Sequence, residues 1–177
     1  MAQVSVPVVL ALGANLGDRA ATLAGAVTAL AAVDGLVVHA LSPAFATTPV
    51  GGPPQPEYLN AVLLARTTLA PDLLLAACQG VEAVHGRERT LRWGPRSLDI
   101  DVVAYGAAGS PDEVLQDDPD LTLPHPRAHL RAFVLAPWAA LDPNALLRLP
   151  DGTLSSVCAQ LAAANDRADV HLQGALP

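Results

Sequence analysis

The sequence contains no lysine, and all ten of its basic residues are arginines. Acidic side chains outnumber them, so the formal net charge is −7. Proteins that bind nucleic acids or acidic membranes non-specifically rely on a broad cationic surface. The composition therefore argues against both kinds of partner, and positive potential has to be local.

Cysteine and long apolar runs are also scarce. Cys78 and Cys158 are eighty residues apart, with no Cys-x-x-Cys motif and no histidine at metal-ligand spacing. Neither a disulfide framework nor a zinc site is indicated. The first residues, MAQVSVPVVLAL, have no basic segment before their apolar part, which Gln3, Ser5 and Pro7 interrupt. We therefore expect a cytoplasmic protein without a signal peptide or a membrane span.

Aromatic residues make up only 3% of the 177 residues, so the core has to consist mainly of Ala, Leu and Val. A chain of this length can bury about 70% of its unfolded surface in one domain. We expect a single domain over residues 1–165 and a frayed tail over residues 166–177. A flat heterocyclic ligand would have to stack on one of the few aromatic residues, which are Phe45, Tyr58, Trp93, Tyr105, Phe133 and Trp138.

Hydrophobic periodicity predicts strands that alternate with helices. Strands are expected at residues 4–12, 36–41, 58–67 and 97–105. Helices are expected from Asp18 to Gly35, from Pro71 to about His85, and over residues 131–140 and 154–164. This order predicts an α/β or α+β fold, with a mixed sheet on which the helices pack.

The segment RWGPRSLDIDVV, from Arg92 to Val103, carries the strongest functional signal. In an extended chain Asp99 and Asp101 lie on one face, and their apolar neighbours lie on the other. Magnesium takes one or two protein carboxylates and fills its remaining positions with water and phosphate oxygens. Four arginines within ten positions precede this pair and suit phosphate, namely Arg87, Arg89, Arg92 and Arg96. The segment therefore indicates a site for a metal-bound polyphosphate, although a solvated arginine loop before an ordinary half-buried strand is the simpler alternative.

Four motifs in order resemble one known family. They are ALGANLGDR at residues 11–19, TTPVG before QPEYLNAV, the arginine cluster with RWGPRSLDID, and LPHPR followed by Arg131 and Phe133. Together they span roughly residues 5–160 and are similar to 6-hydroxymethyl-7,8-dihydropterin pyrophosphokinase of folate biosynthesis. The resemblance implies a ferredoxin-like α+β fold of three layers, with helices on both faces of the sheet. It also implies that ATP and two Mg²⁺ ions serve the transfer of pyrophosphate to the hydroxymethyl oxygen of the pterin, with release of AMP.

The resemblance assigns roles to residues one by one. The magnesium ligands are Asp99 and Asp101, and the catalytic arginines are Arg87, Arg89 and Arg96. The ATP-binding residues are Gln79, Glu82, Arg92, Ser97, Ile100, His125 and Arg131. The pterin-binding residues are Thr47, Thr48, Val50, Tyr58, Asn60, Trp93 and Phe133. The expected partners are ATP and a reduced pterin, without nucleic acid or membrane, and the expected assembly is a monomer or weak homodimer.

Two other readings remain open from the residues themselves. Another magnesium-dependent phosphotransferase or nucleotidyltransferase could use the same aspartate pair, although the absence of a Gly-x-x-x-x-Gly-Lys motif disfavours a P-loop kinase. A noncatalytic ligand-binding relative could keep the fold and lose turnover. Taken singly, Tyr58 and Phe133 could be core residues, Gln79 and Glu82 could be a solvated helix face, and His125 could merely fix a turn.

Overall fold

The structure is a computed structural model that describes residues 4–49, 55–85 and 97–177. Its first half consists of β1 (Val6–Ala14), α1 (Arg19–Ala31), β2 (Leu36–Leu41), β3 (Ala44–Thr47), β4 (Tyr58–Thr67), α2 (Pro71–Val84) and β5 (Asp99–Tyr105). Its second half consists of β6 (Gln116–Asp117), β7 (Thr122–Leu123), η1 (Ala128–Leu130), α3 (Ala132–Leu141), β8 (Leu146–Arg148), β9 (Leu154–Ser156), α4 (Val157–Ala163), η2 (Arg167–Asp169) and β10 (Val170–Gly174).

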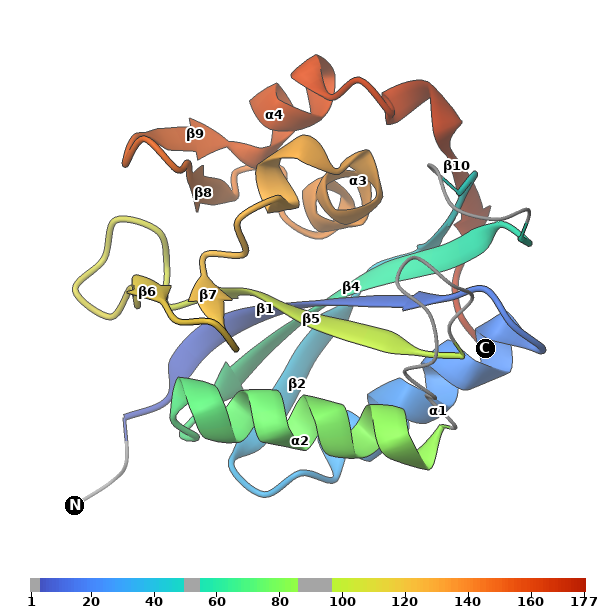
Figure 1. The fold of residues 1–177 in the computed structure, drawn as a ribbon, viewed down its shortest axis with the longest axis horizontal. Helices are drawn as coiled ribbons and strands as arrows, with labels where there is room; N and C mark the ends of the chain where they lie inside the picture. The colour runs from blue at the N-terminus through green and yellow to red at the C-terminus, as the bar shows by residue number, and fades with distance from the viewer. Residues whose placement is uncertain (1–3, 50–54, 86–96) are drawn as a thin grey trace.

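Six strands form the main sheet in the order β10-β3-β4-β1-β5, with β2 also paired to β4. Helices α1 and α2 lie on one face, and α3 and α4 lie on the other (Figure 1). Each face has its own apolar core, one beneath α1 and α2 and the other beneath α3 and α4. The predicted α+β class with helices on both faces is therefore confirmed.

Helix α1 joins β1 to β2, and helix α2 joins β4 to β5. These two crossover connections explain the directions of the strands. Strand β1 pairs antiparallel with both β4 and β5, and the pairings of β2, β3 and β10 are antiparallel as well. The sheet was expected to be mixed because a helix that joins two strands leaves them parallel. Here each crossover skips one strand: β4 lies between β1 and β2, and β1 lies between β4 and β5. The parallel strands are therefore not neighbours in the described sheet.

Local sequence signals explain where the first elements begin and end. The carboxylate of Asp18 accepts a hydrogen bond from the backbone N–H of Ala21 at 3.0 Å, as expected for an N-cap of α1. Gly35 follows α1 with a φ of 85°, a conformation that side chains with a Cβ rarely adopt, and the chain turns there into β2. Pro71 occupies the first turn of α2, where its missing N–H costs no helical hydrogen bond.

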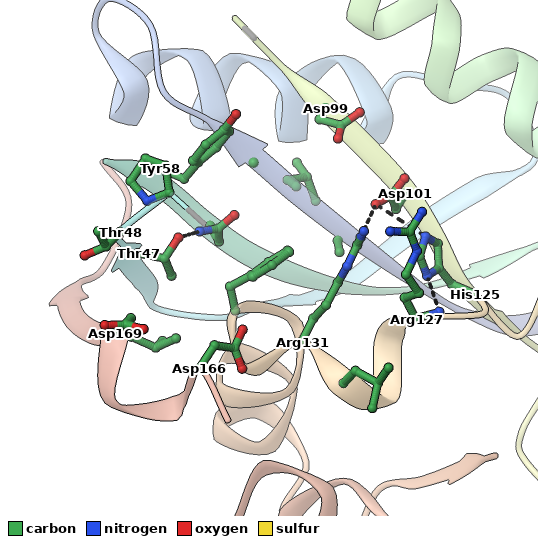
Figure 2. Close-up of a pocket in the computed structure, with 18 of the residues that line it drawn as sticks. Thr47, Thr48, Tyr58, Asp99, Asp101, His125, Arg127, Arg131, Asp166 and Asp169 are labelled. Atoms are coloured by element: carbon green, nitrogen blue, oxygen red, sulfur yellow. Dashed lines mark hydrogen bonds and ion pairs between the residues drawn. The ribbon is translucent and has the colours of Figure 1, made fainter. Parts of the chain in front are cut away.

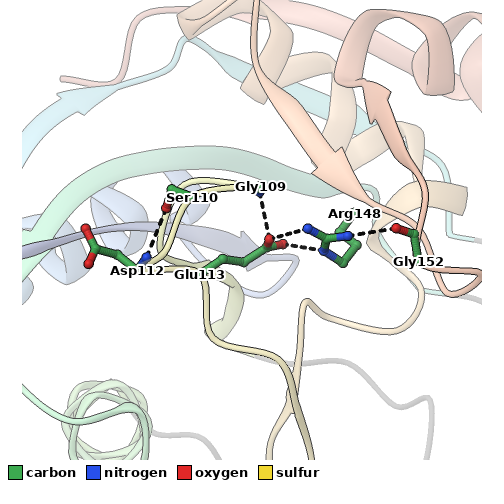
Figure 3. A network of polar contacts seen from close by, with 6 residues as sticks. All are labelled: Gly109, Ser110, Asp112, Glu113, Arg148 and Gly152. Atoms are coloured by element: carbon green, nitrogen blue, oxygen red, sulfur yellow. Dashed lines mark hydrogen bonds and ion pairs between the residues drawn. The ribbon is translucent and has the colours of Figure 1, made fainter.

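A salt bridge holds the acidic loop after β5, residues 106–120, in place. Arg148 of β8 donates from Nε and Nη2 to the two carboxylate oxygens of Glu113, at 2.9 and 2.6 Å (Figure 3). The N–H of Gly109 also donates to Glu113, and Arg148 donates to the carbonyl of Gly152. This bidentate pair fastens the acidic loop of residues 106–120 to the β8–β9 hairpin.

The C-terminal region differs from the expectation in two ways. Residues 154–156, expected to begin a helix, form β9, and α4 starts only at Val157 because Ser156 supplies its N-cap. Residues 166–177, expected to be frayed, contain η2 and β10. Strand β10 pairs with β3 at the edge of the main sheet, so its backbone groups have partners there.

Among the described residues, no helix is long and apolar enough to cross a membrane. Cys78 is buried, Cys158 is exposed, and both are free thiols.

Candidate active site

A cavity of about 540 Å³ opens on the α3 side of the sheet. Its walls come from β1, β3, β4 and β5, from the turn around His125, from the start of α3 and from the C-terminal segment. Figure 2 shows Asp99 and Asp101 on one side of this pocket, and Thr47, Thr48 and Tyr58 on another. The volume lies in the range of small-molecule sites, about 300 to 1,000 Å³.

Strand β5 presents its two carboxylates to the pocket. Asp99 and Asp101 are half-buried pocket residues, whereas Ile100 and Val102 between and after them are buried in the core beneath α1 and α2. The predicted alternation of β5 is therefore confirmed. Arg131 Nη1 lies 3.7 Å from Asp101 Oδ2, and His125 Nε2 lies 3.8 Å from the same oxygen.

His125 is held in one tautomer beside these carboxylates. Its backbone N–H donates to the carbonyl of Val103 on β5, and its ring Nδ1 accepts from the N–H of Arg127 at 3.2 Å. Nδ1 therefore carries no proton, and Nε2 bears the N–H that faces Asp101. Burial, with Arg131 and Arg127 close by, lowers the pKa of His125 to about 4. At neutral pH this residue is an uncharged hydrogen-bond donor toward the pocket.

The start of α3 contributes a cation and an aromatic ring. Arg131 immediately precedes the helix, and its guanidinium carbon lies 5.5 Å from the ring centroid of Phe133. Both residues line the pocket. The arginine therefore contacts Asp101 on one side and the aromatic face on the other, which fixes its position between the two halves of the pocket.

The opposite wall is a polar pair on neighbouring strands. Asn60 of β4 and Thr47 of β3 are both about 5% exposed, and the Asn60 amide donates to the Thr47 hydroxyl at 2.9 Å. A Cβ at Gly13 on β1 would lie only 2.9 Å from Asn60 Oδ1. Glycine at this position therefore leaves the space that the Asn60 side chain occupies.

Tyr58 flanks this wall at the start of β4. Its hydroxyl donates to the side-chain oxygen of Gln55 at 3.3 Å, and the buried Asn15 donates to that same oxygen at 3.0 Å. The turn after β1 is thus tied to the segment that enters β4. This contact holds an aromatic ring at the rim of the pocket.

Four of the predicted ATP-binding residues lie outside the pocket lining. Glu82 is 2% exposed and accepts a hydrogen bond from the backbone N–H of Ile100 at 2.7 Å, whereas Gln79 on the same helix is exposed. The alternative interpretation of Gln79 and Glu82 as a solvated helix face therefore does not hold for Glu82, whose carboxylate is buried against the β5 backbone. Ser97 is half-buried, and the Ile100 side chain is in the core.

Cys78, one turn before Glu82, is fully buried. Burial and the neighbouring carboxylates of Glu82 and Asp101 raise the pKa of this thiol to about 12. The thiol therefore stays protonated and is not a nucleophile.

The remaining predicted residues lie outside the described part of the chain. They are Val50, Arg87, Arg89, Arg92, Trp93 and Arg96. Nine predicted residues line the pocket together. They are Thr47, Thr48, Tyr58, Asn60, Asp99, Asp101, His125, Arg131 and Phe133.

Several pocket residues were not predicted. Arg127 follows the LPHP motif directly, and Gln55 precedes Tyr58 by three positions, so their proximity to predicted residues was an available signal. No such signal existed for the C-terminal residues Asn165, Asp166, Asp169 and Val170, which line the pocket through long-range contacts.

The donor set at β5 fits a hard cation. Two half-buried carboxylates suit Mg²⁺, which needs only one or two protein ligands when phosphate oxygens and water complete its octahedron. Within residues 4–49, 55–85 and 97–177, no group of three or more His, Cys, Asp or Glu side chains forms a metal site. An open two-carboxylate site of this kind favours a metal that arrives with a polyphosphate over a permanently caged ion.

Comparison with known proteins agrees with this geometry. A family model described as 7,8-dihydro-6-hydroxymethylpterin-pyrophosphokinase (HPPK) matches residues 9–143. The chain is 46% identical over 138 residues to the 2-amino-4-hydroxy-6-hydroxymethyldihydropteridine pyrophosphokinase of Methylorubrum extorquens, covering 78% of this chain and 84% of that protein. It is 46% identical over 144 residues to the enzyme of the same name from Mycobacterium tuberculosis, covering 79% and 74%. The Pseudomonas aeruginosa enzyme is 42% identical over 145 residues, covering 82% and 85%.

A solved structure has the same fold. The Plasmodium falciparum HPPK-DHPS structure with pterin and p-hydroxybenzoate aligns with a TM-score of 0.67 at 12% identity. The alignment covers 95% of this chain and 46% of that longer chain, and at 12% identity the likeness concerns the fold alone. The extent of the family match and the identity to the curated enzymes confirm the resemblance that the motifs indicated. The chain therefore belongs to the 7,8-dihydro-6-hydroxymethylpterin pyrophosphokinase family.

Proposed function

We propose that this protein transfers a pyrophosphoryl group from ATP to the hydroxymethyl oxygen of 6-hydroxymethyl-7,8-dihydropterin and releases AMP. The reaction is a step of tetrahydrofolate biosynthesis. The enzyme would work in the cytoplasm as one catalytic domain, with two small-molecule substrates, and as a monomer or weak homodimer. Its two unpaired cysteines are compatible with a reducing compartment.

One observation carries the proposal. A single cavity holds two carboxylates at one end and a polar, aromatic wall at the other, with Arg131 between them. The carboxylate end suits a metal-bound polyphosphate. The other end offers Asn60 and Thr47 for hydrogen bonds and Tyr58 and Phe133 for stacking, which suits a flat heterocycle with polar edges.

Asp99 and Asp101 would hold two Mg²⁺ ions together with the ATP phosphates. When bound, magnesium supplies charge neutralisation and orientation of the phosphates. His125 would donate from Nε2 to a phosphate oxygen, and Arg131 would pair with the same polyphosphate, since both already face Asp101. Arg87, Arg89 and Arg96 would neutralise the developing charge as catalytic arginines, and Arg92 would contact ATP.

The remaining ATP contacts are proposed from the family match. Gln79 would contact ATP from the exposed surface of α2. Ser97 and Ile100 would contact ATP through groups at the beginning of β5. Glu82 would act indirectly. Its carboxylate accepts from the backbone N–H of Ile100, which lies between the two aspartates.

In the reaction, the hydroxymethyl oxygen bonds to the β-phosphorus of ATP. The bond from that phosphorus to the oxygen of the α-phosphate breaks, so AMP leaves with the bridging oxygen and the hydroxyl proton passes to solvent. Such transfers depend on in-line positioning and neutralisation of charge more than on covalent help. We assign no general base.

The pterin would bind between Tyr58 and Phe133, with its edge against Asn60 and Thr47. Thr48, Val50 and Trp93 complete the proposed pterin-binding set. The hydrogen bond from Asn60 to Thr47 supports this role, because it orients the amide before the substrate arrives.

The decisive experiment mixes the purified protein with ATP, Mg²⁺ and the reduced pterin and quantifies AMP against ADP. AMP that forms only when pterin is present supports pyrophosphoryl transfer. ADP would instead indicate an ordinary magnesium-dependent kinase. Neither product, with folding verified by circular dichroism, would indicate a noncatalytic relative that only binds ligands.

A further inference from the structure

The C-terminal segment holds the first turn of α3 in place. Both carboxylate oxygens of Asp166 accept from the backbone N–H of Ala132, at 3.0 and 3.2 Å. The first N–H groups of a helix have no acceptor within the helix. The residue in the N-cap position, Arg131, makes no side-chain capping bond, so a residue 34 positions later supplies the acceptor.

The capped amide lies between two pocket residues. Ala132 is flanked by Arg131, whose Nη1 lies 3.7 Å from Asp101, and by Phe133, whose ring lies 5.5 Å from the Arg131 guanidinium carbon. A shift of the Ala132 backbone would therefore move both the cation that faces Asp101 and the Phe133 ring, which lines the same pocket as Tyr58. One hydrogen-bonded amide serves both ends of the pocket.

The segment that carries Asp166 is also fixed to the opposite wall. The carbonyl of Asp169 accepts from the backbone N–H of Thr48 at 3.4 Å, and Val170 pairs with Thr47 in the sheet. Figure 2 shows Asp166 and Asp169 side by side on the C-terminal segment, next to Thr47 and Thr48. Residues 166–170 thus connect β3 to the start of α3.

We propose that Asp166 is a positioning residue for the pterin side of the site. The inference rests on the proposed pyrophosphokinase function and adds a residue beyond the matched range of 9–143. Asp166 acts through Ala132. Its carboxylate keeps Phe133 at the distance from Tyr58 and Asn60 that the pterin ring requires. Because Arg131 also contacts Asp101, loss of the cap affects Phe133 more than Arg131.

A matched control exists at the other end of the same helix. Asp142 ends α3, and its carboxylate accepts from the backbone N–H of Asn144 at 3.0 Å. Asp142 is not among the residues that line the pocket. Asp142→Ala and Asp166→Ala therefore each remove a carboxylate-to-amide contact from one end of α3, but only the second removes it beside the pocket.

The test compares Asp166→Ala, Asp166→Asn and Asp142→Ala in the full chain. For each variant we would measure KM for the pterin, KM for ATP, kcat and Tm, and follow hydrogen exchange of the Ala132 amide by NMR. Asp166→Ala should raise the pterin KM about tenfold, the size expected for one lost hydrogen bond to a charged group, and change kcat less than about threefold. Asp166→Asn keeps an acceptor oxygen and should stay within about threefold of the parent in pterin KM. Asp142→Ala should lower Tm without changing either KM.

Three outcomes would overturn the proposal. The first is a parent-like pterin KM in Asp166→Ala despite faster exchange at Ala132. The second is a raised KM with unchanged exchange, which would mean that Asp166 acts on the substrate directly. The third is an Asp166→Asn variant as impaired as Asp166→Ala. If the parent itself forms no AMP, the proposed function fails, and exchange at Ala132 still reports whether Asp166 anchors α3.

Discussion

On the face of the sheet that α1 and α2 cover, β1, β4 and β5 contribute mostly apolar residues to one core, such as Leu10, Leu63 and Val102. On the α3 face the same strands are apolar only where the second core covers them, as at Val62 and Val103. Beyond that core, the positions on this face are Gly13, Asn60 and the two aspartates of β5. The site occupies the part of the sheet that a helix leaves uncovered.

This difference separates stability from function within single strands. Leu63 and Asn60 belong to one strand, yet Leu63 is fully buried in the first core and Asn60 lines the pocket. Substitutions on the covered face should change the free energy of unfolding, and substitutions on the open face should change catalysis. Four predictions test this division.

The largest effect is expected at the carboxylate end. Asp101→Ala should lower kcat/KM by about 10³-fold or more, because a group that stabilises transition-state charge is lost; this corresponds to about 4 kcal/mol. The fold should survive, since Asp101 is half-exposed. Steady-state AMP formation at saturating Mg²⁺ measures the loss, and Asp118→Ala, an exposed carboxylate outside the pocket, is the control. Unchanged activity in Asp101→Ala would remove the metal assignment.

The next largest effect is expected on the face of the sheet that α1 and α2 cover. Leu63→Ala should destabilise the protein by about 2 to 5 kcal/mol, because it leaves a cavity in the core beneath α1 and α2. Chemical denaturation measures this change. The kcat of the folded protein should stay near the parent value, and Leu73→Ala, at a position that is 55% exposed, should change stability little. A large loss of kcat with normal stability would contradict the division between the two faces.

A smaller effect is expected at the polar wall. Asn60→Ala removes the hydrogen bond to Thr47 and an amide that faces the pocket, so the pterin KM should rise about tenfold while the KM for ATP stays the same. Asn144→Ala, an exposed amide far along the chain, serves as the comparison. If both KM values rose equally, the polar wall would not be specific to the pterin.

The smallest effect is expected at the salt bridge between Arg148 and Glu113, which lies in the acidic loop of residues 106–120. Hydrogen bonding from Arg148 holds the pKa of Glu113 below its ordinary value of 4.5. The folded state therefore binds fewer protons than the unfolded state near that pH, and the stabilisation present above pH 4.5 is lost as the pH falls through the lower, folded pKa. Thermal unfolding should give Glu113→Gln a lower Tm than the parent at neutral pH, and the gap should close in acid. A gap independent of pH would show that the charge of Glu113 contributes nothing, and kcat should be unchanged throughout.

Local sequence patterns were sufficient for the elements that build the sheet. The Asp18 cap, the Pro71 start of α2 and the strand at residues 58–67 each have a signal within a few residues, and each lies where it was predicted. The alternation of β5 likewise needed only the period of an extended chain. The aspartate pair could therefore be identified from the sequence before the fold was known.

The sequence was insufficient where contacts are distant along the chain. Strand β10 is short and partly polar, and it is ordered by pairing with β3, more than 120 residues earlier. The burial of Glu82 could not be predicted because its partner, the Ile100 amide, is 18 positions away. The role of Asp166 depends on a contact across 34 positions, which no local pattern reports.

The pocket draws its walls from Ala11 through to Val170. During translation, the ribosome releases β1 first and β10 last among the elements that contribute to these walls. A nascent chain that has emerged as far as α3 already possesses both aspartates, the Asn60 and Thr47 pair and the α1 and α2 core. It still lacks the segment that joins β3 to α3. The connection between β3 and α3 can therefore form only after β1 to β5 and α3 have been synthesised, so the pocket is completed after most of its walls are present.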